Sequence, residues 1–326
     1  MNRHAAPSGR AKDAPRRPST SPGRHSAPTA KAVRSTTERR KLTPARWLKS
    51  HSWRHLIAVL AVAFAVFPVI WVVSAAFDRD PTISGGAVFP SSPTLNNFHT
   101  LFSNPDQPYG RWYVNSMIIA SITAFFTVLI GALAAYAFSR FRFKGRKAGM
   151  LTLLLVQMFP AFLALVAIYL ILNQLTTIIP AVGLNSRPGL ILVYLGGALG
   201  VNAWLIKGFF DTIPMDLDES AKVDGATHGQ IYWGIILPLA APVLAVVGLL
   251  SFIGTINEYI MASAILQTPD MLTLSVGLNG FISSKYQENW GPFCAGALLA
   301  AIPVVILFIF LQRYIVDGLT AGSVKG

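Results

Sequence analysis

The chain has 326 residues, of which 53% are hydrophobic and only 13% are charged. Because a soluble domain usually has about one quarter of its residues charged, this composition excludes an ordinary water-soluble enzyme and favours a polytopic membrane protein. The formal net charge of +13 does not indicate nucleic-acid binding over the whole chain, because residues 1–54 hold 14 of the 27 Lys and Arg residues and only two acids.

The N-terminal segment 1–54 is rich in Ala, Pro, Ser, Thr and Arg and has almost no large apolar residue before Trp47. Such a segment cannot bury enough apolar surface to offset the entropy lost on ordering, so we predict a disordered basic cytoplasmic tail. An arm that binds anionic lipid headgroups or nucleic acid is an alternative. A solvated extension that helps to fix the topology is favoured, because the ordinary excess of Lys and Arg in cytoplasmic segments explains the charge without a nucleic-acid partner. Membrane lipid is an expected partner of the protein as a whole.

Six stretches are apolar and long enough to cross a bilayer, which takes about 20 residues of helix. They cover 55–77, 113–138, 148–172, 188–208, 238–261 and 291–315. The sequence therefore predicts an all-α polytopic membrane protein with six transmembrane helices in a domain of residues 55–316. Pro68 and Pro160 predict kinks, because each removes a backbone hydrogen bond. The spacing of Gly196 and Gly200 allows close helix contact but is weak evidence alone.

The distribution of basic residues predicts the orientation of these spans. With a cytoplasmic N-terminus, 23 Lys and Arg residues fall on the cytoplasmic side and four fall outside, whereas the reverse topology inverts the two numbers. Because cytoplasmic segments carry the excess of Lys and Arg, we expect both termini in the cytoplasm of a bacterial cell, with the protein in its inner, or cytoplasmic, membrane. The segment 209–237 is then cytoplasmic and the loop 262–290 lies outside.

The segment 209–237 has the pattern of two short helices joined by a glycine turn. Pro214 suits the first turn of a helix, and Asp216, Asp218 and Glu219 follow, where the helix dipole favours acids. Gly225 then marks the turn, and the following stretch leads to the next span. The pattern predicts an ordered protrusion, although a capped interfacial helix between two spans explains the helical features equally well.

The residues of this protrusion resemble the EAA loop of binding-protein-dependent ABC importer permeases. The matching positions, with Ser220 in place of the family's second position, are Glu219, Ala221, Asp224, Gly225, Ala226, Ile235, Leu237 and Pro238. The stretches IKGFFDTIP, LAVVGLLSFIGTINEYIMAS and GLTAGSVKG are similar to carbohydrate permeases of the MalG type. The similarity runs from about residue 55 to the end, and the long basic tail departs from it.

The resemblance implies a type I ABC importer permease fold and a role for the protrusion in contacting a separate ATPase. It implies polar contacts from Glu219 and Ser220, a turn at Gly225, and close approach to the ATPase at Ala221 and Ala226. Asp224 is expected either to cap or salt-bridge at the turn or to be solvated at the helix end. No G-x-x-x-x-G-K-[ST] phosphate loop occurs in the chain, so ATP hydrolysis is assigned to a partner.

The C-terminal tail 317–326 is rich in small residues and predicts a flexible cytoplasmic end. The resemblance favours a contact between this tail and the ATPase subunits over a simple frayed terminus. The residues proposed for the contact are Gly322, Ser323, Val324 and Lys325.

Polar residues inside the spans are candidates for a pathway or gate, because such residues usually face a cavity or a partner helix. They are Gln157, Asn202, Asn257 and Glu258. Gln157 and Asn202 are expected to satisfy neighbouring helices rather than to touch substrate. A straight helix from Pro238 places Glu258 roughly 30 Å away, at the outer interface and with an exposed carboxylate.

These observations predict one permease subunit of an ATP-driven carbohydrate importer. The resemblance implies a second permease subunit, two ATPase subunits, an extracytoplasmic sugar-binding protein and a maltose-like oligosaccharide as substrate, with trehalose or another disaccharide as the alternative. An ion-coupled secondary transporter is disfavoured, because no deep carboxylate is evident. A membrane enzyme is disfavoured as well, because no catalytic residue set, metal site or cofactor motif is recognised.

Overall fold

The computed structural model describes residues 44–79, 81, 89–283 and 289–321, and within these ranges the regular structure is helical. The only strand-like pairing there is an isolated bridge between Asp78 and Pro93. The all-α prediction is therefore confirmed. The chain divides into two compact units, 1–58 and 59–326, and the packing described below is that of the second unit.

Three helices in the described ranges are continuous and apolar over a length that can cross a membrane: α1 (Pro44–Phe77), α3 (Tyr109–Arg140) and α14 (Trp290–Ala321). Three bent pairs raise the number of possible spans to six. They are α4 (Arg146–Met158) with α5 (Leu165–Ile178), α6 (Arg187–Gly196) with α7 (Gly200–Phe210), and the helical stretch His228–Leu239 with α11 (Ala241–Asn257). The six predicted spans thus correspond to three continuous helices and three bent ones.

The ends of two outer helices differ from the predicted boundaries. Helix α1 begins at Pro44, so residues 44–54 are helical rather than disordered. Helix α14 continues to Ala321, so residues 317–321 are helical rather than a flexible tail. The first extension follows from a sequence without Gly or Pro in residues 45–54, whereas the second passes through Gly318, which a helix tolerates at a cost of about 1 kcal/mol. Residues 1–43 and the predicted tail contacts Gly322, Ser323, Val324 and Lys325 lie outside the described residues.

The bend between α4 and α5 has a local cause in the sequence. Helix α4 ends before Pro160, and Phe159 is extended, as a residue before proline prefers. A 3-10 turn (Ala161–Ala164) then leads into α5, and the two halves are bent by 77°. The α6–α7 pair is bent by 56° between Gly196 and Gly200, and the pair joined at Ala240 by 76°. The kink at Pro160 is therefore confirmed, whereas α1 continues as a helix through Pro68.

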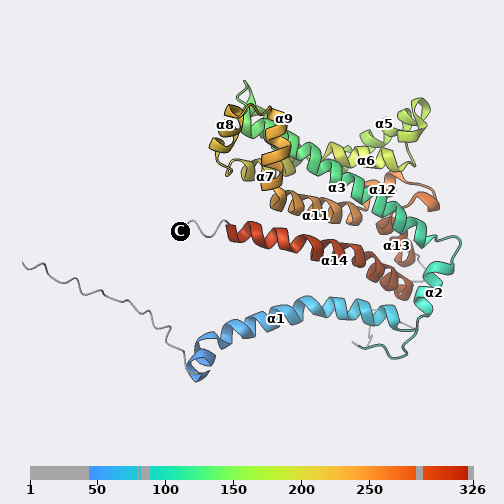
Figure 1. Cartoon of the computed structure of the whole chain (residues 1–326). Helices are drawn as coiled ribbons and strands as arrows, with labels where there is room; N and C mark the ends of the chain where they lie inside the picture. Colours follow the sequence, from blue (N-terminus) through green and yellow to red (C-terminus); the bar gives the residue numbers. More distant parts are fainter. Residues whose placement is uncertain (1–43, 80, 82–88, 284–288, 322–326) are drawn as a thin grey trace, which may run out of the picture. The chain divides into compact units, whose positions relative to one another are not determined.

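Helix α3 is the centre of the packing. It lies against α11, α7 and α6, and α11 in turn packs on α14. Small residues allow the close approach, since Ala132, Ala135 and Ala203 are fully buried and a Cβ at Gly131 would lie 3.2 Å from Ile206. Figure 1 shows α8 and α9 gathered at one end of α3, and α2 and α13 at the other. Helix α3 therefore links two distant regions of the unit.

The segment 262–290 was expected to be a long loop, but most of its described part is helical. It contains the end of α12 (Ile260–Ile265), a 3-10 turn (Pro269–Met271) and α13 (Leu274–Ile282). The start of α3 holds it in place. Trp112 Nε1 donates to the Pro269 carbonyl at 2.7 Å, and Asn115 Nδ2 donates to two further carbonyls of the segment at 2.8 and 2.9 Å. These contacts make it a fastened cap rather than a free loop.

Candidate functional site

The EAA-like segment forms two short helices around a glycine turn, as its pattern predicts. Helix α8 (Met215–Val223) is followed by a turn at Gly225. The φ of this residue is +84°, a backbone conformation that glycine adopts easily. The Gly225 and Ala226 N–H groups donate to the Lys222 and Ala221 carbonyls at 3.0 and 2.9 Å, which is a Schellman ending. Helix α9 (His228–Ile231) then starts with a capping box between Thr227 and Gln230.

A buried ion pair fastens α8 to the end of α3. Arg140 Nε lies 2.7 Å from Asp218 Oδ2, and the two side chains are only 4% and 6% exposed. Arg140 also donates through Nη2 to the Ile213 carbonyl at 3.1 Å. From the sequence, Asp218 was expected only to interact favourably with the dipole of its own helix. Its burial against Arg140, which lies 78 positions earlier, could not be predicted from the neighbouring residues.

Two further contacts join the same end of α3 to this segment. Ser139 Oγ donates to Asp211 Oδ1 at 2.7 Å, and the Tyr136 hydroxyl donates to the His228 carbonyl at 3.4 Å. Burial alone raises the pKa of Asp211, but hydrogen bonds from Lys207 and Ser139 and nearby positive charges outweigh it, so that the pKa is lowered. Asp211 is therefore held as a carboxylate where α7 meets α8.

Helix α8 has an inner and an outer face. Ala221 and Ala226 are partly buried and pack against an apolar cluster of α3, α7 and α9 that includes Ile206, Phe210 and Ile231. The close approach of these two alanines to an ATPase stays a prediction, and within this subunit their small size serves the packing of α8 on its neighbours. The outer face is exposed and includes Glu219, Ser220, Val223 and Asp224.

The exposed face combines apolar residues with acids. Val223 is 88% exposed and Leu217 is 42% exposed, so both leave apolar surface outside the packing of the subunit. Asp224 is the C-cap residue of α8 and forms no ion pair with another described residue. Its side chain is exposed at the helix end, and the choice between a cap or salt bridge at the turn and simple solvation stays a prediction for the assembled complex.

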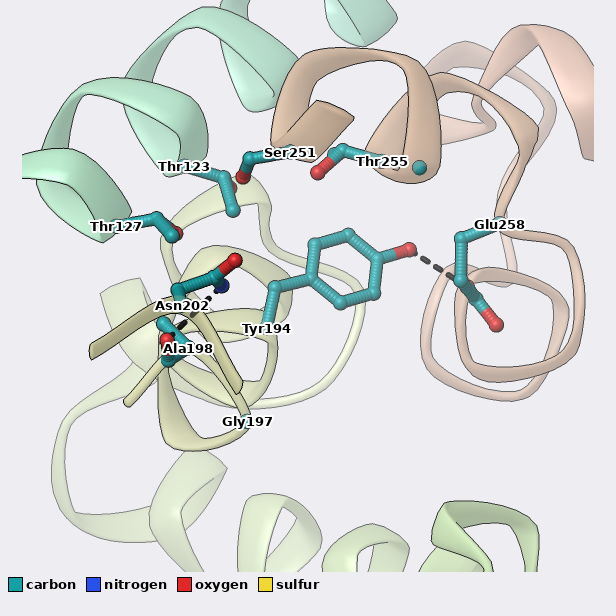
Figure 2. A pocket seen from close by; sticks show the side chains of 10 residues that line it. Thr123, Thr127, Tyr194, Gly197, Ala198, Asn202, Ser251, Thr255 and Glu258 are labelled. Carbon is teal, nitrogen blue, oxygen red and sulfur yellow. Dashed lines mark hydrogen bonds between the residues drawn. The ribbon is translucent and has the colours of Figure 1, made fainter. Parts of the chain in front are cut away.

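A second candidate site is a cavity of about 230 Å³ between α3, the α6–α7 break and α11. Figure 2 shows how these elements surround it, with the Tyr194 ring pointing between the facing helices. Its lining residues are Thr123, Thr127, Tyr194, Gly197, Ala198, Asn202, Ser251, Gly254, Thr255 and Glu258. The cavity brings Asn202 and Glu258 together, as a pathway requires.

Glu258 lies at the edge of this cavity and is half-buried rather than exposed. The expected exposed carboxylate is not found, because Tyr194 reaches it from α6, and the position of Glu258 at the outer interface stays a prediction. The Tyr194 hydroxyl donates to Glu258 Oε2 at 2.7 Å, and the Met261 and Ala262 N–H groups donate to its two carboxylate oxygens at 2.8 and 3.0 Å. The carboxylate thus caps the first turn of α12 and ties it to α6.

Gln157 joins two helix breaks. From the end of α4 its Nε2 donates to the Gly197 carbonyl, and its Oε1 accepts from the Val201 N–H at 2.8 Å. A Cβ at Gly200 would overlap the Gln157 side chain, so the glycine allows this approach. The expectation that Gln157 satisfies a neighbouring helix is confirmed, and the G-x-x-x-G close contact is found at Gly200 but not at Gly196.

The other two predicted pathway residues, Asn202 and Asn257, lie on different cavities. Asn202 Nδ2 donates to the Ala198 carbonyl one turn earlier at 3.0 Å, and the side chain lines the 230 Å³ cavity. Asn257 is exposed and lies on a different cavity, between α11, α13 and α14. The structure therefore does not bring Asn257 together with Glu258 and Asn202.

The hydroxyl residues of the cavity were not among the residues expected from the sequence. Thr123 and Thr127 are one helical turn apart on α3, and Ser251 and Thr255 repeat this spacing on α11. Polar residues at i and i+4 lie on one face of a helix. That spacing in two apolar spans was the available signal, but single hydroxyls are common in membrane helices and draw little attention.

The sequence matches one described protein family over a large part of its length. Residues 127–320 match the family described as binding-protein-dependent transport system inner membrane component. The matched region contains both the α8–α9 segment and almost all of the cavity lining.

Characterised relatives match over most of the chain. The galactooligosaccharides transport system permease protein GanQ of Bacillus subtilis is 43% identical, with 83% of this chain and 94% of the relative covered. The maltose/maltodextrin permease MalG of Vibrio vulnificus is 40% identical over 86% and 97% of the two chains. The maltodextrin permease MdxG of Bacillus subtilis is 39% identical over 83% and 95%.

Solved structures share the fold. A chain of a bacterial ABC transporter involved in the import of the acidic polysaccharide alginate superposes with a TM-score of 0.67 at 22% identity, covering 83% of this chain and 98% of that one. A second alginate transporter structure, in complex with a pentasaccharide-bound periplasmic protein, gives a TM-score of 0.62 at 19% identity, covering 82% and 96%. This likeness shows the permease fold.

Proposed function

Since the chain belongs to the binding-protein-dependent transport system inner membrane component family, we propose that it forms half of the translocation pathway of an ATP-driven carbohydrate importer. The other half is a second permease subunit, two ATPase subunits supply the work, and an extracytoplasmic binding protein delivers the sugar. The relatives are transport permeases rather than enzymes.

The α8–α9 segment is the proposed site of coupling to the ATPase. The observation that carries this proposal is its two-sided construction. One face is fixed to α3 by the buried Arg140–Asp218 pair and by apolar packing, whereas the other exposes Glu219, Ser220, Val223 and Asp224. A partner that pushes on the exposed face moves α3 with it, because the fastened face gives little freedom between the two helices.

We propose a neutral maltose-like di- or oligosaccharide as the substrate, with trehalose or another disaccharide as the alternative. The relatives' names refer to galactooligosaccharides and maltodextrins, and one structural neighbour is titled for acidic alginate. The 230 Å³ cavity favours a neutral sugar, because no Lys, Arg or His is among its lining residues. A polyanion requires such cations for recognition.

The orientation completes the proposal. The excess of Lys and Arg on one side supports a position of α8 and α9 in the cytoplasm of a bacterial cell, where ATP is available. The α12–α13 segment would then lie outside, where a binding protein can dock. The tail residues Gly322 to Lys325 are retained as a proposed additional contact with the ATPase.

The test of coupling uses substitutions on the exposed face. Val223→Asp places a charge on a side chain that is 88% exposed, so it leaves the fold intact but disfavours an apolar contact with the ATPase. Gly225→Asp adds a side chain at a φ of +84° and alters the turn. Both variants are expected to insert into the membrane, to lose co-purification with the ATPase and to abolish sugar uptake.

Lys144→Asp is the matched control, because it also introduces an aspartate at an exposed position, in the loop between α3 and α4. It is expected to retain co-purification and uptake. Normal ATP-dependent uptake by Val223→Asp and Gly225→Asp would show that the segment does not carry the coupling.

A further inference from the structure

The 230 Å³ cavity is lined mainly by neutral hydrogen-bonding groups. Thr123 and Thr127 project from α3, and Ser251 and Thr255 face them from α11 (Figure 2). Thr123 is only 3% exposed, and its Oγ1 has no hydrogen-bond partner among the described residues. Because buried polar groups are normally paired, an unpaired hydroxyl on a cavity wall indicates a partner that comes from the cavity itself.

Asn202 adds an amide group opposite these hydroxyls. Its Nδ2 is used in the hydrogen bond to the Ala198 carbonyl, and its oxygen is turned toward the cavity in Figure 2. Hydroxyls both donate and accept, and an amide oxygen accepts. A ligand with several hydroxyl groups can therefore pair with each member of the lining.

The charge of the lining argues against an ion. Glu258 is the only carboxylate on the wall, and its oxygens already accept hydrogen bonds from Tyr194, Met261 and Ala262. No cationic side chain is among the lining residues to pair with an anionic ligand. The chemistry that remains suited to this wall is a neutral polyhydroxyl compound.

The size of the cavity limits how much ligand it can take. About 230 Å³ lies below the roughly 300–1,000 Å³ of sites for drug-sized molecules, so there is room for one sugar ring rather than for an oligosaccharide. The Tyr194 ring supplies an aromatic face of the kind that packs on apolar C–H groups. Gly197 and Gly254 carry no side chain that would fill the space.

A larger cavity of about 820 Å³ adjoins this one and shares Tyr194, Gly197 and Glu258 with it. Its other lining residues are mostly apolar and include Phe159 and Phe162. It offers few partners for hydroxyl groups, so the hydroxyl-lined cavity is the better match for a sugar ring.

We propose that Thr123, Thr127, Asn202, Ser251 and Thr255 form a subsite for one neutral hexopyranosyl unit, so that this subunit itself contacts the sugar during transport. The inference rests on the proposed function, because it requires that a carbohydrate enter the membrane region of this chain.

The experiment compares Thr123→Val, which removes the hydroxyl while keeping the shape, with Thr123→Ser, which keeps it. Both are measured in the complete transporter with its second permease, ATPase and binding protein in proteoliposomes, using labelled maltose and galactobiose within a panel of neutral di- and oligosaccharides. Loss of one hydrogen bond to a neutral sugar predicts an about two- to tenfold lower kcat/KM for Thr123→Val. Thr123→Ser is expected to retain the wild-type value.

Ser121→Ala is the matched control, because Ser121 also carries a hydroxyl on α3 but is exposed on another face. It is expected to have no effect. A deoxy sugar that lacks the hydroxyl paired with Thr123 should reduce wild-type transport to the level of Thr123→Val, whereas a merely structural role for Thr123 would lower transport of every sugar equally.

The two proposals fail in different ways. If wild-type complexes import sugar and Thr123→Val and Ser251→Ala are both indistinguishable from wild type for every sugar and deoxy analogue, the subsite is overturned and the importer stands. If wild-type complexes import no sugar of the panel, the proposed function is overturned and the subsite with it. If Thr123→Val assembles poorly, the half-buried Ser251→Ala variant decides the matter by the same comparison.

Discussion

The buried ion pair between α3 and α8 gives the sharpest prediction about coupling. Replacing Arg140 by Met leaves the Asp218 carboxylate unpaired in a position where its side chain is 6% exposed. Removing one partner of a buried pair costs about 3–5 kcal/mol. Because Asp218 Oδ1 already lacks a hydrogen-bond partner among the described residues, the pair is incompletely satisfied and we expect about 3 kcal/mol, the lower end of that range.

The double variant Arg140→Met/Asp218→Leu removes both charges and fills the space with apolar side chains. Such replacements are often neutral, so its unfolding free energy is expected within about 1 kcal/mol of wild type. The assay is a double-mutant cycle of unfolding in mixed micelles, with Arg142→Met, an exposed neighbour, as the control that changes stability by less than about 0.5 kcal/mol. Additive effects of the two single substitutions would refute the reasoning.

Uptake assays on the same variants distinguish two roles of the ion pair: the attachment of α8 to α3, and a separate function of the charges themselves. If rigid attachment of α8 is what coupling needs, each single variant loses ATP-dependent uptake and the double variant recovers it. If the double variant is stable but inactive, the charges have a role beyond attachment.

The remaining predictions concern packing, a helix break and pH. Gly277→Ala places a Cβ against the Trp112 ring, which is held by its hydrogen bond to a carbonyl, so thermal melting should show a loss of about 1–3 kcal/mol. Gln157→Leu leaves a carbonyl and an N–H of the α6–α7 break without their side-chain partner. It should destabilise the protein by about 1–3 kcal/mol and increase hydrogen exchange at that break, and unchanged exchange would contradict the assigned role. Because the pKa of Asp211 is lowered in the folded protein, its carboxylate stabilises the fold above the pKa of the unfolded chain. This stabilisation declines as the pH falls through the folded pKa. Acid titration of the wild type should show the decline, and the Asp211→Asn variant should lack it.

Much of the fold was predictable because membrane spans follow from length and apolarity alone. The break at Pro160 and the turn at Gly225 were predictable too, since each depends on the residue's own backbone chemistry. The bend at Ala240 was harder to foresee. It lies between Pro238 and Pro242 within one apolar run, and a continuous hydropathy signal does not reveal a change of helix direction.

The parts of the site that were missed depend on contacts between distant residues. The burial of Asp218 requires Arg140 from another helix, and the carboxylate of Glu258 is half-buried because Tyr194 reaches it from α6. Neither partner is marked by spacing along the chain. The inward packing of Ala221 was hidden for the same reason, because a small residue suits close approach to its own subunit as well as to a partner.

Helix α3 connects the two candidate sites without a break, and α11 follows the α8–α9 segment along the chain. Helix α3 runs from Arg140, at the ion pair, to Thr127 and Thr123 on the cavity wall, a distance of about 20–25 Å at 1.5 Å per residue. Helix α11 starts at the bend after Ala240 and carries Ser251 to the same cavity about 15 Å further on. On the proposed coupling, a displacement of α8 would reach the α3 wall through one continuous helix, whereas the α11 wall lies beyond the 76° bend at Ala240. The opposite wall is built on the α6–α7 break, whose bend of 56° is a second place where the backbone can adjust. The proposed coupling therefore predicts that a movement of α8 changes the width of the cavity rather than shifting the cavity as a unit.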